Sequence, residues 1–114
     1  MPSYRINKIN EQVREVMTEI LRTVKDPRVS RAFVTVSAAD VSKDLSVARI
    51  YYGVITGDAE DVAKGLGSAG GYIRSELASR LNLRVTPRLV FIKDESGERA
   101  LRIAELLKEN GETQ

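Results

Sequence analysis

Apolar residues recur every three or four positions over residues 4–24, which predicts an amphipathic helix. The stripe is formed by Ile6, Ile9, Val13, Val16, Ile20 and Val24. Charged side chains fill the opposite side, so the stripe is expected to face a protein core. Asp26-Pro27 ends the helix, because proline lacks an N–H group and disfavours helical backbone in the preceding residue.

Residues 32–41 and 45–56 lack helical spacing and are rich in small and β-branched side chains, which favours strands. The polar residues 42–44 between them predict a turn, so the two segments are expected to form an antiparallel hairpin. Successive side chains of a strand point to opposite faces, which places Tyr51 and Tyr52 on different sides of the sheet.

A second helical pattern starts after Asp58, a residue type that caps helix N-termini well. Gly70-Gly71 interrupts this pattern, because a glycine inside a helix is less stable than alanine by about 1 kcal/mol. The period then resumes through Ile73 and Leu77. We therefore expect two short helices that meet at a glycine kink.

Residues 86–93 predict a third strand that begins near Pro87, and residues 98–109 predict a final amphipathic helix. The resulting order is α-β-β-α-kink-α-β-α. This order favours an α+β fold in which a three-stranded sheet carries its helices on one face. Residues 1–110 are expected to form one domain, with residues 111–114 as a flexible C-terminal tail.

Composition narrows the possible chemistry. The 114-residue chain has no Cys and no His, which excludes disulfides, His- or Cys-bound zinc, and His-dependent catalysis. Carboxylates offer no catalytic pair, since Asp40 and Asp44 flank a turn while Glu60 and Asp61 begin a helix. We therefore expect no enzyme activity, no cofactor and no small-molecule substrate. No membrane-length apolar run and no leader peptide are evident, so a cytoplasmic protein is expected.

Charge is distributed unevenly along the chain. The net charge is only +2, yet residues 68–93 carry five Lys/Arg and one Glu, and the first helix is also basic. Such segments indicate a face suited to phosphates. Basic residues also commonly solvate helix surfaces, and charge alone leaves both interpretations open.

Residues 65–70 read GLGSAG and match the dinucleotide-binding pattern G-x-G-x-x-G. That pattern requires a strand directly before the glycines and an acidic residue about twenty positions later. Here a helical segment precedes the glycines, and Leu89, Val90 and Phe91 stand where the acid belongs. A phosphate-binding P-loop is excluded too, because no Lys-Ser/Thr pair follows.

Gly67-Ser68-Ala69-Gly70 also has the letters of the G-x-x-G element that K-homology domains place between two helices. There the glycines let a nucleic-acid backbone approach the protein backbone. The tetrapeptide lacks the Lys or Arg of a standard single-strand clamp. The remaining interpretation is that the glycines only permit close helix packing.

The chain resembles the ribosome-binding factor A family over about residues 4–107. The resemblance rests on residues 25–28 (KDPR), 44–51 (DLSVARIY), 71–77 (GYIRSEL) and 83–91 (LRVTPRLVF), followed by Asp94. In that family an Ala-x-Gly kink replaces G-x-x-G, and Ala69-Gly70-Gly71 fits it. The chain departs from the family at Arg88, where an acid is common, and in the short linker after Asp94.

The resemblance implies a type II K-homology-like fold and a non-enzymatic role in late maturation of the small ribosomal subunit. Such a protein would bind ribosomal RNA near the decoding region, support 5′-end processing, and leave before translation. A role in cold adaptation is typical of the family. Partners would be the small subunit and its ribosomal RNA, with no membrane, and the protein is expected to be a monomer.

The implied RNA-binding residues are Ala69, Gly70, Gly71, Arg74, Arg80, Arg84, Arg88, Arg5 and Lys8. The arginines would contact phosphates, while the kink would set the angle between the helices and admit a ribose-phosphate strand. Two alternatives stay open: a protein–protein interaction module whose basic face is incidental, and a general single-stranded RNA-binding K-homology domain.

Overall fold

The computed structural model describes residues 4–95, without the side chain of Tyr4. The elements are α1 (Tyr4–Leu21), α2 (Pro27–Ser30), β1 (Phe33–Val41), β2 (Val47–Thr56), α3 (Ala59–Ser68), α4 (Gly70–Arg80) and β3 (Arg88–Lys93). The final helix expected at residues 98–109 and the tail at 111–114 lie outside the described residues.

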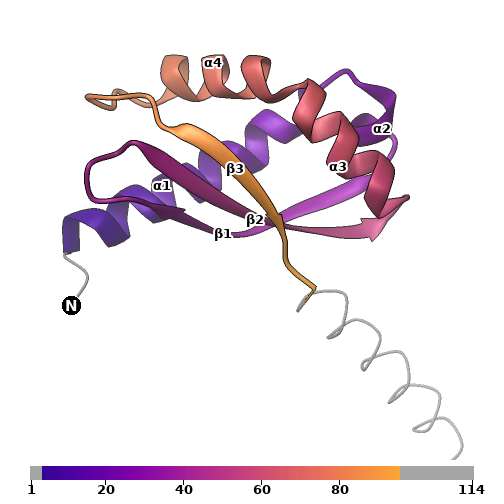
Figure 1. Ribbon diagram of the computed structural model, residues 1–114, viewed down its shortest axis with the longest axis horizontal. Coiled ribbons are helices and arrows are strands. Elements are labelled where there is room, and N and C mark those ends of the chain that lie inside the picture. The colour runs from indigo at the N-terminus through magenta and orange to yellow at the C-terminus, as the bar shows by residue number, and fades with distance from the viewer. Residues whose placement is uncertain (1–3, 96–114) are drawn as a thin grey trace, which may run out of the picture.

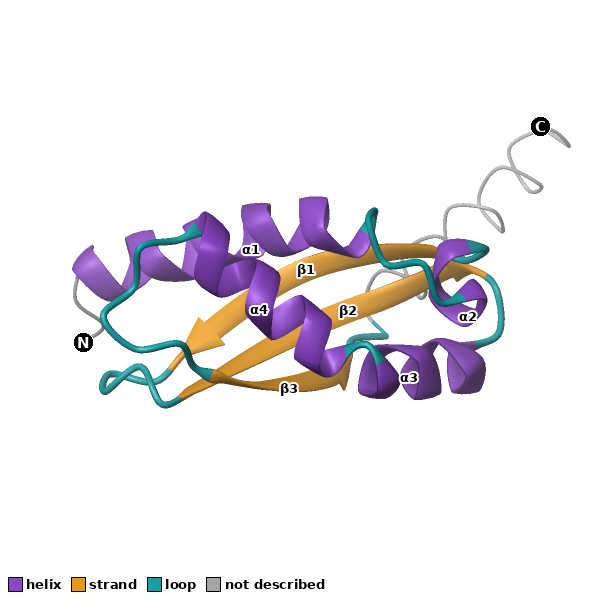
Figure 2. Cartoon of the chain, turned by 90° about the horizontal axis from the view of Figure 1, so that it is seen from above, coloured by secondary structure: helices purple, strands orange, loops and turns teal. Residues whose placement is uncertain are grey.

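The strands form a three-stranded sheet in the order β1-β2-β3. β1 and β2 pair antiparallel, as the hairpin prediction requires, whereas β2 and β3 pair parallel. A parallel partner needs a long crossover connection, and α3 and α4 provide it. The long helices cover one face of the sheet (Figures 1 and 2). The α+β prediction with helices on one face is confirmed.

The core lies between the sheet and this helical layer. Val13 and Ile20 of the predicted stripe are fully buried, which confirms that the stripe faces the core, and Met17 of α1 is buried beside them. From the sheet, Ile50 is equally buried, and Tyr52 packs edge-on against Phe91 of β3 with ring centroids 6.4 Å apart. Full burial of one large apolar side chain stabilises a fold by about 1.5–3 kcal/mol, so α1 is a main contributor.

The connection between β1 and β2 is longer than the predicted turn. Leu45, the residue expected to begin the second strand, has a positive φ of 62° and is 6% exposed. Asp44 accepts hydrogen bonds from the Ser46 hydroxyl (2.7 Å) and N–H (3.1 Å), and these bonds lower the pKa of the Asp44 carboxyl. Because Leu45 is buried and the Asp44–Ser46 hydrogen bonds keep the chain in a turn, β2 begins only at Val47.

The short helix α2 was not predicted. Asp26 is its N-cap and accepts from the Arg28 N–H at 3.0 Å, while Pro27 occupies the first turn, where its missing N–H is harmless. The Arg28 guanidinium also donates two hydrogen bonds to this carboxylate, from Nε to Oδ1 at 3.0 Å and from Nη2 to Oδ2 at 2.7 Å. These bonds lower the pKa of Asp26. Asp26-Pro27 therefore begins a helix, whereas α1 ends earlier, at Leu21.

Helix α2 packs on α3 at Gly65. A Cβ at this position would lie 2.7 Å from Val29 Cγ2 and 3.1 Å from Arg28 Cβ, both in α2. Glycine at 65 therefore permits the close approach of the two helices, and the contact also buries Val29.

We expect Gly65→Ala to lower the free energy of unfolding by about 1–3 kcal/mol, because the added methyl group overpacks a closed contact. The matched control is Gly67→Ala in the same helix, where a Cβ meets no described atom within 4 Å. That change should stabilise the protein by up to about 1 kcal/mol through helix propensity. Urea denaturation followed by circular dichroism measures both; equal effects would contradict the packing role of Gly65.

Candidate nucleic-acid interface

The junction between α3 and α4 lies at Ala69, not at a glycine. Ala69 has φ −87° and ψ 2°, a conformation open to any residue, and its N–H donates to the carbonyl of Gly65 at 2.9 Å. Gly70 and Gly71 are the first residues of α4. The prediction of two helices joined at a kink is confirmed, and the junction residue is the first one of the expected Ala69-Gly70-Gly71 element. The break in periodicity had placed the kink at Gly70-Gly71, one residue later, and glycines are not required for the backbone angles of Ala69.

The glycines around the junction are open to solvent on the side where a side chain would stand. A Cβ at Gly67, Gly70 or Gly71 would meet no described atom within 4 Å. Close helix packing therefore does not explain them, and that interpretation is wrong for these positions, although it holds for Gly65. What they leave at the surface is a stretch of bare backbone around Ala69.

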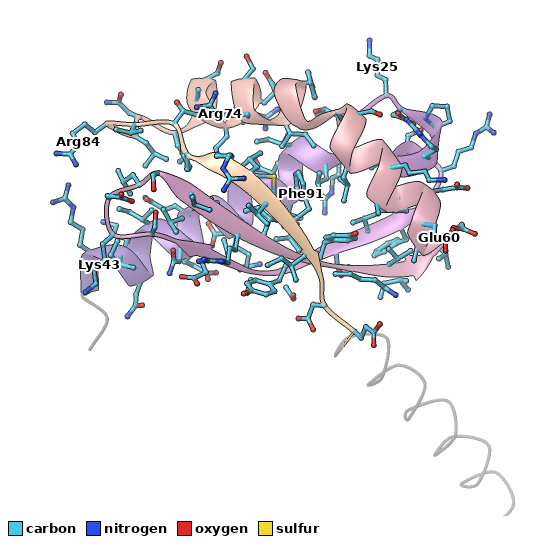
Figure 3. All side chains as sticks on the ribbon, in the orientation of Figure 1. Lys25, Lys43, Glu60, Arg74, Arg84 and Phe91 are labelled. Carbon is cyan, nitrogen blue, oxygen red and sulfur yellow. The ribbon has the colours of Figure 1, made fainter. Side chains whose placement is uncertain are left out.

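Arg74 is held by the protein itself. Its Nε donates to the carbonyl of Pro87 at 3.1 Å, and its Nη2 donates to the carbonyl of Thr86 at 2.8 Å. Figure 3 shows the side chain reaching from α4 toward the chain that enters β3. Arg74 thus fastens the α4–β3 loop to the helix, which leaves fewer of its donors for a phosphate.

Arg80 is also engaged within the protein. Its guanidinium pairs with Glu19 of α1 at 3.5 Å and with Glu76 of α4 at 3.2 Å. Two carboxylates beside one guanidinium reverse the local charge, so this part of α4 offers little attraction to RNA.

The other predicted cations lie at one end of the molecule. Arg5 and Lys8 are exposed near the start of α1, Arg84 is exposed in the α4–β3 loop, and Arg88 is exposed at the start of β3. The same end holds exposed Lys43, which the charge pattern of the sequence did not single out; Figure 3 shows it on the same side as Arg84. We call Arg5, Lys8, Lys43, Arg84 and Arg88 the basic end.

Hydrogen bonds hold the segments of the basic end together. Asn10 Oδ1 of α1 accepts from the N–H of Val41 at 2.8 Å, which places the start of α1 beside the β1–β2 turn. The Arg88 N–H donates to the carbonyl of Ser46 at 2.9 Å, which places the start of β3 at the same turn. None of the five basic side chains forms an ion pair with a residue of the described range 4–95.

A surface pocket of about 360 Å³ lies at the helix junction. Residues 23–26 line one side, and Ser68, Ala69 and Tyr72 line the other. Tyr72, which is 45% exposed, and Lys25 were not predicted as site residues. The available signal was that Tyr72 precedes the buried Ile73 and so falls outside the apolar stripe of α4.

Other kinds of site find no support in residues 4–95. No three His, Cys, Asp or Glu side chains in that range come together as metal ligands. None of the helices described is long and apolar enough to cross a bilayer.

Comparison with known proteins identifies the family. The family profile described as ribosome-binding factor A matches residues 5–107. The chain belongs to the ribosome-binding factor A family. It is 43% identical to the ribosome-binding factor A of Methylobacillus flagellatus over 106 residues, which is 92% of this chain and 83% of that protein. The relative from Clostridioides difficile is 40% identical over 110 residues, covering 95% and 86%.

Solved structures of the family share the fold. The crystal structure of ribosome-binding factor A from Thermus thermophilus matches with a TM-score of 0.71 at 29% identity, covering 79% of this chain and 97% of that one. A solution structure from Thermotoga maritima, described as a putative ribosome binding factor A, matches with a TM-score of 0.70 at 30% identity, covering 84% and 92%. The K-homology-like fold expected from the sequence is confirmed.

A Thermus thermophilus ribosome-binding factor A fitted into a map of a 30S complex also matches. Its TM-score is 0.64 at 30% identity, and the match covers 75% of this chain and 91% of that one. The family is therefore one of ribosome-binding factors, in agreement with the resemblance seen in residues 71–91.

We expect Arg74→Ala to reduce the free energy of unfolding by about 1–2 kcal/mol, since two hydrogen bonds to loop carbonyls are lost. Arg74→Lys should recover only part of this, because an ammonium cannot present the fork of a guanidinium. Arg88→Ala, which removes an exposed arginine from the same region, should change stability by less than about 0.5 kcal/mol. Urea unfolding measures the three free energies of unfolding. If Arg74→Ala is as stable as the wild type, the Arg74 hydrogen bonds do not stabilise the α4–β3 loop.

Proposed function

We propose that this protein binds the small ribosomal subunit through its ribosomal RNA during late maturation, supports processing of the RNA 5′ end, and leaves before translation. It acts in the cytoplasm as a monomer, without catalysis or a cofactor. Family membership supports the ribosomal partner, as does the structural neighbour described in a complex with the 30S subunit.

The observation that carries the proposal is the basic end. Arg84 and Arg88 lie at the same end of the molecule as Lys43, and none of the three has an ion-pair partner among the described residues, so their charge is available to a polyanion. Phosphate contacts of this kind provide affinity and orientation without reading sequence. Arg74 and Arg80 stabilise the loop and the helices instead, so the main electrostatic contact is assigned to the end of the molecule.

A protein–protein module is the competing function. Such a module would normally present one contiguous apolar patch. The exposed large apolar side chains of the described residues are Phe33 (59%), Tyr72 (45%) and Val85 (42%), which come from β1, α4 and the α4–β3 loop. Phe33 and Tyr72 line two different surface pockets and so do not form one apolar patch, which favours the RNA interpretation.

Sedimentation of cell extract tests the assignment. We expect the protein to migrate with immature small subunits at low salt, to be absent from translating ribosomes, and to dissociate steeply as salt is added, since bound phosphates release counterions. A protein that stays in the free fraction at low salt would sink the ribosomal role. Association that is insensitive to salt would favour the protein–protein module.

The double variant Arg84→Glu/Arg88→Glu should weaken subunit binding at least about tenfold near 0.1 M salt, because each lost phosphate contact lowers the slope of log affinity against log salt by about 0.7–0.9. Arg31→Glu/Lys64→Glu is the matched control: it changes the charge equally at exposed positions outside the basic end. Filter binding to purified immature subunits measures both. If the two variants weaken binding equally, only net charge matters and the basic end is not the contact.

A further inference from the structure

The pocket at the α3–α4 junction has features that the basic end does not explain. Around one hollow of about 360 Å³ it brings together an exposed aromatic ring, the junction residue Ala69 and a lysine with no ion-pair partner among residues 4–95. The open glycines Gly67, Gly70 and Gly71 lie next to Ala69 in the chain, outside the lining. This volume is near the lower end of the range of about 300–1,000 Å³ typical of small-ligand sites. A hollow of this size suits one nucleotide.

The ring of Tyr72 is held in place although it is exposed. Its hydroxyl lies 2.6 Å from Thr23 Oγ1, and Thr23 Oγ1 donates to the carbonyl of Ile20 at 2.7 Å. The tyrosine is therefore oriented by α1 while 45% of it stays open to solvent. An oriented, solvent-open aromatic ring is the platform on which proteins stack an unpaired base.

The charge around the pocket suits a nucleotide. Lys25 belongs to the pocket lining, and its exposed side chain projects into solvent (Figure 3). It forms no ion pair with any residue between 4 and 95. The one carboxylate in the lining, Asp26, is neutralised by the two-point contact with Arg28. Arg28 Nη2 also donates to Ser68 Oγ at 3.1 Å, which connects the neutral Asp26–Arg28 pair to the junction.

The glycines supply the approach path. Gly67, Gly70 and Gly71 carry no side chain on the open side of the junction, so a sugar-phosphate strand can lie against the backbone beside the pocket. A base inside a duplex cannot stack on Tyr72, because both faces of that base are already covered by the neighbouring bases.

We propose that this pocket binds a single unpaired nucleotide of RNA, with its base stacked on Tyr72 and its phosphate beside Lys25. The proposal rests on the proposed function and adds to it a preference: the RNA at the junction is single-stranded, whereas the basic end contacts phosphates of any RNA. Thr23 acts as a positioning residue for the ring.

The test uses the full chain and two probes, a fluorescein-labelled six-nucleotide single-stranded RNA and the same sequence annealed into a blunt duplex. Fluorescence anisotropy gives affinities, and amide NMR shifts report on Ser68, Ala69 and Tyr72. We expect the single strand to bind more tightly and to shift these amides, while the duplex leaves them unchanged.

Substitutions separate stacking from fold and charge. Tyr72→Leu should weaken single-strand binding about 5- to 150-fold, the range for one stacked base. Tyr72→Phe keeps the stacking ring but loses the hydrogen bond to Thr23, so it should bind more weakly than the wild type and at least about threefold more tightly than Tyr72→Leu. Lys25→Ala should lower the salt slope by about 0.7. Phe33→Leu removes a comparably exposed ring outside the pocket and should leave binding unchanged.

Two outcomes would overturn the proposal: unchanged single-strand binding by Tyr72→Leu, and equal amide shifts with the duplex. If Tyr72→Leu binds the oligonucleotide normally but loses subunit association, the pocket belongs to a segment of a ribosomal protein instead. Sedimentation of the wild type with small subunits is run in parallel. Co-migration of the wild type would show that the ribosomal role stands even where the pocket proposal fails.

Discussion

Burial of one side of α1 against the sheet and α4 is the interaction on which the rest of the structure depends. Val13, Met17 and Ile20 are fully buried in this contact. Both candidate binding regions are attached to the same helix. Near its start, Asn10 bonds to Val41 and places the basic end; just beyond its last turn, Thr23 bonds to Tyr72 and places the pocket. A change in the packing of α1 against the sheet would therefore displace both regions together.

The basic residues divide into two groups with different physical roles. In the first group each guanidinium is bound within the protein: Arg28 to Asp26, Arg74 to loop carbonyls, and Arg80 to two glutamates. These arginines stabilise the local structure. The basic end and Lys25 have no such partners among the described residues, so their charge remains available to an external anion. A count of cations along the chain overstates the charge of α4 and understates that of the molecular end.

The glycines at the helix junction illustrate a conflict between stability and exposure. Helix propensity favours alanine over glycine by up to about 1 kcal/mol, with a smaller difference at helix ends such as Gly67 and Gly71. Nothing in the described structure fills the space at either position. The backbone angles of Ala69 require no glycine either. Residues that cost stability without a packing or conformational reason are expected where a surface must stay bare, which agrees with a strand of RNA passing the junction.

Periodicity in the sequence was enough to predict the stripe of α1, the hairpin, the paired helices α3 and α4, and β3, because each depends on local spacing and on short-range turn chemistry. The helix α2 was missed because an Asp-Pro pair is compatible both with the end of one helix and with the start of the next, and spacing alone does not separate these two cases. The start of β2 was misplaced because burial of Leu45 outweighs its unfavourable backbone angle.

The candidate site was predicted less completely. Sequence identified the basic third quarter and the junction, because charge and glycine are visible residue by residue. Which arginines are free depends on carboxylates and carbonyls far away in the chain, such as Glu19 for Arg80 and Pro87 for Arg74. Lys43 and Tyr72 acquire their neighbours only when the β1–β2 turn meets Arg88 and the end of α1 meets α4. The sequence by itself therefore determined the elements and the chemistry available on them, while the tertiary structure decided which charges and rings face outward, because that depends on contacts between distant segments.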